Sequence, residues 1–101
     1  MSLQGKTAVV IGASGQHNFG VAIARLLAQN GAKVVVSGRR LAPLQALAKD
    51  INGLAIACDM SDPDSIAALF TEAKAQTGRV DVAINSAGGL AASPIAMLTP
   101  E

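Results

Sequence analysis

Short apolar segments alternate with amphipathic segments along this chain, and this alternation constrains the fold more than any other feature of the sequence. Four runs rich in Val, Ile and Ala predict buried strands over residues 6–12, 32–37, 54–57 and 80–85. Between them, apolar residues recur every three or four positions, which predicts helices over residues 18–30, 41–51 and 63–77. Strands that alternate with helices of this length indicate right-handed βαβ units and a parallel sheet.

The predicted fold class is therefore α/β, a Rossmann-type doubly wound parallel sheet. We expect about four strands in the order 3-2-1-4, with helices on both faces. Helix-end signals agree with this interpretation: Gly31 follows the first helical pattern, Asp62 and Pro63 suit the start of the third, and Gly78 suits its end. Residues 86–101 are expected to form a loop, with 99–101 as the start of a further helix, which leaves the edge of the fourth strand unpaired.

Composition excludes several classes of function. The net charge is +1, no basic block stands out and neither Tyr nor Trp is present, so a nucleic-acid footprint is not indicated. The apolar runs are shorter than the roughly 20 residues that cross a bilayer, and no secretory signal is recognisable. Cys58 and His17 are the only residues of their types, so we expect no internal disulfide, no metal site, a buried core role for Cys58 and a cytoplasmic location.

Three glycines, Gly12, Gly15 and Gly20, lie between the first predicted strand and the first predicted helix. A helix N-terminus in this position offers unpaired N–H groups and the positive end of the helix dipole to an anion, with Ser14 and Asn18 as further hydrogen-bonding groups. The spacing matches neither G-x-G-x-x-G nor an ATP-type phosphate loop, so a tight strand–helix turn without a ligand is an alternative.

The second and third predicted strands are followed by charged residues. Arg39 and Arg40 stand where an NAD site would place a carboxylate, and a guanidinium there suits the 2′-phosphate of NADP; two solvated surface arginines are the alternative. Asp59 could accept a hydrogen bond from the adenine amino group, with Met60 covering the ring, or could be a turn residue only.

Taken together, these motifs resemble the N-terminal half of the short-chain dehydrogenase/reductase family. The matching segments are residues 6–14 (KTAVVIGAS), 37–39 (SGR), Asp59, and 81–88 (DVAINSAG). The glycine spacing is two residues wider than the family's G-x-x-x-G-x-G loop, and NSAG stands in place of its NNAG motif. The resemblance implies a cofactor site formed by Gly12, Ser14, Gly15, Asn18, Phe19, Gly20, Arg39, Arg40, Asp59, Met60, Asn85, Ala87 and Gly88.

The same resemblance implies an NADP(H)-dependent oxidoreductase that transfers a hydride between nicotinamide and a carbonyl or alcohol substrate, with NADP(H) preferred over NAD(H). Family members are commonly dimers or tetramers. The family's catalytic Tyr-x-x-x-Lys pair lies beyond the fourth strand, and this chain has no Tyr, so no catalytic residue is assigned and neither Ser86 nor Ser93 is expected to be a nucleophile.

We therefore expect residues 1–101 to be one NADP-binding domain, truncated before the catalytic half of a longer reductase. The alternative is a stand-alone nucleotide-binding or regulatory module without catalytic activity. A third possibility, a methyltransferase of related fold, is disfavoured by Gly38 and Arg39 where an acidic residue would be needed.

Overall fold

The computed structural model describes residues 2–12, 19–85 and 93–95. Its elements, in chain order, are β1 (Thr7–Ile11), α1 (Phe19–Gln29), β2 (Lys33–Gly38), α2 (Leu41–Ile51), β3 (Leu54–Ala57), α3 (Pro63–Thr77), β4 (Val82–Asn85) and β5 (Ser93–Ile95). The predicted alternation of strands and helices is confirmed, because each predicted element is present and its limits agree to within two residues.

The strands form one sheet in the order β3-β2-β1-β4-β5, in which β1 to β4 are parallel. The predicted order 3-2-1-4 is thus confirmed. In the registers, Ile11 lies opposite both Ser37 of β2 and Asn85 of β4, and Gly38 lies opposite Ala57 of β3. The four parallel strands therefore end side by side, and the turns that follow them open on one edge of the sheet.

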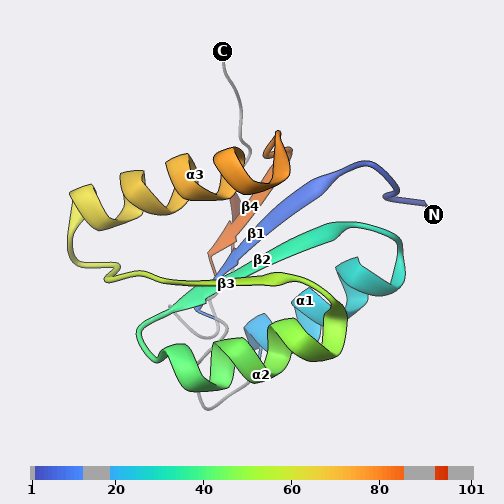
Figure 1. The fold of residues 1–101 in the computed structure, drawn as a ribbon, viewed down its shortest axis with the longest axis horizontal. Helices are drawn as coiled ribbons and strands as arrows, with labels where there is room; N and C mark the ends of the chain where they lie inside the picture. The colour runs from blue at the N-terminus through green and yellow to red at the C-terminus, as the bar shows by residue number, and fades with distance from the viewer. Residues whose placement is uncertain (1, 13–18, 86–92, 96–101) are drawn as a thin grey trace.

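Helices cover both faces of the sheet, as predicted: α1 and α2 lie on one face and α3 on the other (Figure 1). Successive strand residues point to opposite faces. The core beneath α1 and α2 is formed by Val10, Ala24, Val34, Val36, Leu44, Leu47 and Ala48. The core beneath α3 is formed by Val9, Ile11, Val35, Cys58, Leu69, Ala73 and Ala83. Because β1 and β2 are buried on both faces, they read as continuous apolar runs.

Helix α3 begins and ends as its sequence predicts. The Asp62 side chain accepts the backbone N–H of Asp64 at 3.0 Å, which satisfies one of the helix's first free donors, and Pro63 occupies the next position. At the other end, the Gly78 N–H donates to the carbonyl of Lys74 at 2.8 Å. These two ends fix the position at which the chain leaves β3 and returns to β4.

The expectation that residues 86–101 contain no regular structure and leave β4 unpaired is wrong for residues 93–95. These residues form β5, which pairs with β4 in antiparallel orientation, with Asn85 opposite Ser93 and Ala83 opposite Ile95. Pro94 has no N–H to donate, but a strand at the outer edge of a sheet tolerates that loss on its unpaired side. The predicted helix start at residues 99–101 lies outside the described residues.

Candidate functional site

Two backbone hydrogen bonds join the turns at the carboxyl edge of the sheet. The Gly12 N–H donates to the Ser37 carbonyl at 2.7 Å, which links the end of β1 to the end of β2. The Cys58 N–H donates to the Gly38 carbonyl at 2.8 Å, which links the exit of β3 to the exit of β2. Arg39 follows Gly38 and Asp59 follows Cys58, so this second hydrogen bond holds Arg39 and Asp59 near each other.

The exit of β1 leads from a glycine to the start of α1. Gly12 has a φ of +94°, a left-handed conformation that suits a residue without a side chain. Helix α1 begins at Phe19 and has no acidic residue in its first turn, and Gly20 in that turn is buried. Nothing in that turn opposes an anion near the helix N-terminus. The predicted residues Ser14, Gly15 and Asn18 lie outside the described residues.

Both arginines after β2 are exposed. Arg40 occupies the N-cap position of α2 in an extended conformation (φ −107°, ψ 113°), and its side chain does not cap the helix. The described residues form two salt bridges, Arg25–Asp50 and Arg79–Asp81, and neither includes Arg39. The guanidinium of Arg39 therefore forms no salt bridge with a carboxylate in the described part of the chain.

The Asp59 carboxylate is held by the residue two positions further along the chain. Its Oδ1 accepts the Ser61 N–H at 2.9 Å and the Ser61 hydroxyl at 2.7 Å. The Ser61 hydroxyl and N–H and, more weakly, the charge of Arg39 lower the pKa of the Asp59 carboxyl, against an opposing effect of desolvation. Asp59 thus makes a local turn contact through Oδ1, and it stays ionised at neutral pH in an exposed position, with Oδ2 not used by that contact.

Three further predicted residues lie in the turn after β3, at the end of β4 and at the start of α1. Met60 is half-buried and packs against the core beneath α3, so only part of its side chain can face a ligand. Asn85 ends β4 and is half-buried, opposite Ile11. Phe19 is the first residue of α1. Ala87 and Gly88 lie outside the described residues. Cys58, 3% exposed and free, is a core residue as predicted.

Sequence reasoning missed three serines that organise this edge. The fully buried Ser37 hydroxyl donates to the Ile56 carbonyl at 2.6 Å, between β2 and β3. Ser61 holds the Asp59 carboxylate, and the Ser65 hydroxyl accepts the Asp59 N–H at 2.9 Å. The Asp-x-Ser spacing of residues 59–61 is a local signal that could have identified the Ser61 contact. The Ser37 contact requires the register of β2 and β3.

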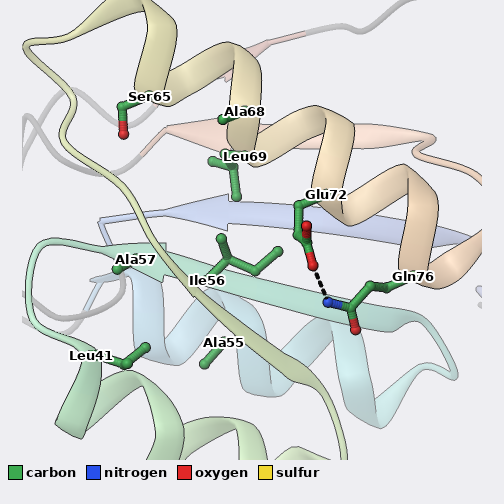
Figure 2. Close-up of a pocket in the computed structure, with 9 residues that line it drawn as sticks. All are labelled: Leu41, Ala55, Ile56, Ala57, Ser65, Ala68, Leu69, Glu72 and Gln76. Carbon is green, nitrogen blue, oxygen red and sulfur yellow. Dashed lines mark hydrogen bonds between the residues drawn. The ribbon is translucent and has the colours of Figure 1, made fainter.

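A shallow groove of about 370 Å³ runs along the open edge of β3, between that strand and α3 (Figure 2). Apolar side chains line most of it, and Glu72 and Gln76 of α3 hydrogen-bond to each other at one end. Ser65 also lines it, so the groove adjoins the turn that carries Asp59. Of the residues predicted for the cofactor site, those that the structure describes do not line this groove.

No group of three or more His, Cys, Asp or Glu side chains within ranges 2–12, 19–85 and 93–95 is placed to hold a metal ion. None of the helices in those ranges combines the length and the apolar character that a membrane span requires.

Comparison with known proteins shows what the chain resembles. A family model described as short chain dehydrogenase matches residues 6–101. The chain is 41% identical over 75 residues to carbonyl reductase family member 4 of Xenopus laevis, covering 73% of this chain and 32% of the relative. It is 37% identical over 90 residues to the 3-oxoacyl-(acyl-carrier-protein) reductase of Escherichia coli, covering 87% of this chain and 36% of that protein.

Solved structures agree with the sequence comparison. The crystal structure of 3-ketoacyl-(acyl-carrier-protein) reductase from Brucella melitensis, complexed with NADH, superimposes with a TM-score of 0.75 at 36% identity, covering 81% of this chain and 34% of that one. The hydroxysteroid dehydrogenase of Escherichia coli gives a TM-score of 0.77 at 30% identity, covering 83% and 36% of the two chains. The chain thus spans about a third of the length of the relatives it matches.

Proposed function

This chain belongs to the short-chain dehydrogenase family, and from that premise we propose that it binds NADP(H) at the carboxyl edge of its sheet. The main support for the proposal is that the residues following three strands lie together. Backbone hydrogen bonds of 2.7 Å between β1 and β2 and of 2.8 Å between the ends of β2 and β3 bring Gly12, Arg39 and Asp59 to one edge of the sheet. The NADH complex of the Brucella melitensis reductase supports a dinucleotide as the ligand class.

The pyrophosphate lies, in this proposal, against the start of α1. Gly12 lets the chain turn out of β1 without a side chain in the way, and Gly20 lets the first helical turn pack close to the sheet. The free N–H groups of that turn attract the negative charge of the phosphates. Ser14, Gly15, Asn18 and Phe19 complete this subsite in the proposal.

The second subsite distinguishes the two nicotinamide cofactors. Arg39 is exposed, forms no salt bridge in the described part of the chain, and follows β2, where the adenosine ribose of a dinucleotide lies in Rossmann folds. A guanidinium there, supported by Arg40, favours the 2′-phosphate of NADP(H). One charge-assisted contact is worth roughly 1.5–3 kcal/mol, or about ten- to a hundredfold in affinity over NAD(H).

Asp59 supplies the third subsite. Its ionised carboxylate accepts a hydrogen bond from the exocyclic amino group of adenine, and the exposed part of Met60 covers the adenine ring. Asn85, at the end of β4, forms a wall of the cofactor site together with Ala87 and Gly88 and braces the sheet. Residues from all four parallel strands thus contribute to one elongated site.

Bound NADPH supplies a hydride that, with one proton, reduces a carbonyl to an alcohol, and NADP⁺ takes it back in the reverse direction. The residues of this chain bind and orient the cofactor, and we assign none of them to proton transfer. Residues 1–101 are, in this proposal, the cofactor-binding domain of a reductase of carbonyl compounds or alcohols. Assembly as a homodimer or homotetramer and a cytoplasmic location extend the proposal; the family and the free Cys58 support them.

The test is calorimetric titration of the protein with NADPH and NADH, repeated with Arg39→Ala and with Arg25→Ala as a matched control. Arg25 is an exposed arginine of α1 paired with Asp50 at 3.1 Å, so its removal changes the net charge equally. We expect Arg39→Ala to lower the affinity for NADPH about ten- to a hundredfold and to leave the affinity for NADH unchanged. Equal losses for both cofactors, or an equal effect of Arg25→Ala, would contradict the assignment.

A further inference from the structure

In the turn between β3 and α3, hydrogen bonds from a neighbouring serine hold one carboxylate. Asp59 has two carboxylate oxygens. Oδ1 accepts both donors of Ser61, at 2.9 Å and 2.7 Å, whereas Oδ2 accepts no hydrogen bond from the described residues. The Ser61 contacts therefore decide which of the two oxygens is left to accept from another molecule.

The backbone of Asp59 is fixed as firmly as its side chain. Its N–H donates to the Ser65 hydroxyl at 2.9 Å, and its carbonyl accepts the Asp62 N–H at 3.1 Å. The preceding residue, Cys58, is tied to Gly38 of β2 at 2.8 Å. Hydrogen bonds to both the backbone and the side chain thus hold Asp59 at the carboxyl edge of the sheet.

Ser61 is not required for the helix that follows. Asp62 occupies the N-cap of α3 and accepts the Asp64 N–H at 3.0 Å, so the Ser61 hydroxyl makes no capping contact. Its hydroxyl donates to Asp59 instead. Ser61 is exposed, and burial in the core does not explain its position either.

We propose that Ser61 is a positioning residue for base recognition. It holds Oδ1 of Asp59 so that Oδ2 accepts a hydrogen bond from the exocyclic amino group of adenine. This inference rests on the proposed function, because it requires a purine dinucleotide in the site. It assigns to Ser61 a contribution to which base is recognised, distinct from any contribution to stability. Ser65 supports the same geometry through the backbone of Asp59.

Base specificity separates this role from a structural one. The reduced nicotinamide hypoxanthine dinucleotide phosphate differs from NADPH in carrying a carbonyl where adenine carries its amino group. An ionised carboxylate attracts the amino group and repels the carbonyl. Dissociation constants of the two cofactors are measured by calorimetry, and their ratio gives the preference for adenine.

We expect the protein to bind NADPH about tenfold or more tightly than the hypoxanthine cofactor. Ser61→Ala should reduce that preference roughly three- to tenfold by lowering the affinity for NADPH alone. Ser61→Thr keeps the hydroxyl and restores the preference. In Asp59→Asn, the amide oxygen takes the Ser61 donors and the NH₂ group takes the outer position, so the preference inverts toward the hypoxanthine cofactor.

The outcomes distinguish the two proposals. If Asp59→Asn leaves the preference for adenine unchanged, the proposed contact between Asp59 and the base is wrong, and the inference about Ser61 fails with it. If Asp59→Asn abolishes or inverts the preference but Ser61→Ala retains the wild-type ratio, the base contact stands and the positioning role of Ser61 is overturned. Equal weakening of both cofactors by Ser61→Ala, without rescue by Ser61→Thr, also overturns it.

Discussion

The carboxylate of Asp81 accepts the backbone N–H of Thr7 at 2.7 Å, although 74 residues of sequence separate the two. The Asp81 N–H returns a hydrogen bond to the Thr7 carbonyl at 2.8 Å, and the Arg79 guanidinium binds both carboxylate oxygens at 2.6 to 3.1 Å. Thr7 is buried. This pair fixes the start of β1 against the approach to β4, at the edge opposite the candidate site.

The Asp81 contact predicts a pH dependence of folding. Hydrogen bonds from Arg79 and Thr7 and the charges of Arg79 and Lys6 lower the pKa of the Asp81 carboxyl in the folded protein, against desolvation. The unfolded chain therefore binds a proton first as pH falls. Asp81 stabilises the fold above its unfolded pKa of about 3.9, and this contribution is lost as pH falls through the lower folded value.

We expect Asp81→Asn to reduce the free energy of unfolding by about 1–2 kcal/mol at pH 7, and the gap from wild type to close below about pH 4. Urea denaturation followed by circular dichroism across this pH range measures it. Asp50→Asn is the control, because its exposed pair with Arg25 contributes at most about 1 kcal/mol. A gap that stays constant down to acid pH would show that charge at Asp81 is not the cause.

Leucine truncation tests the packing of α3 on the sheet. Leu69 is 1% exposed in the core beneath α3, whereas Leu26 of α1 is 60% exposed. Leu69→Ala should cost about 2–5 kcal/mol of unfolding free energy, because it removes buried methyl groups and leaves a cavity. Leu26→Ala should stay within about 0.5 kcal/mol. Similar urea midpoints for the two variants would contradict the position of α3.

The N-cap of α3 gives a local prediction. Asp62→Ala leaves the Asp64 N–H without its acceptor and should lower the unfolding free energy by about 1 kcal/mol. Asp62→Ser supplies another capping oxygen and should recover most of the loss. Thermal unfolding of the three proteins checks this order, and a Ser variant as unstable as the Ala variant would argue against a capping role.

The sequence predicted most of this fold because the strands and helices differ in period. Residues 54–57 and 63–77 are predicted to the residue, since Asp62, Pro63 and Gly78 are strong end signals around an apolar helical face. The strand order follows from the handedness of βαβ connections. The prediction failed at β5, because three residues with a central proline show neither a period nor a favourable strand composition.

The candidate site was predictable only in part. Gly12, Arg39, Asp59 and Asn85 follow strand ends, which periodicity locates, and the structure brings their strand exits to one edge. The hydrogen-bond partners of the serines cannot be predicted from the sequence pattern alone. From the sequence, either Ser61 or Asp62 could cap α3. In the structure Asp62 is the N-cap, and the Ser61 hydroxyl donates to Asp59. Whether Arg39 and Asp59 bind cofactor stays a prediction.

The most direct test of the central claim is to map where NADPH binds by following backbone amide resonances of the protein in ¹⁵N–¹H correlation spectra. Binding at the carboxyl edge should shift the amides of Gly12, Arg39 and Asp59 and leave those of Lys33 and Asp81, at the other edge, unchanged. Shifts confined to the opposite edge or to the groove along β3, or no shifts at millimolar NADPH, would contradict it.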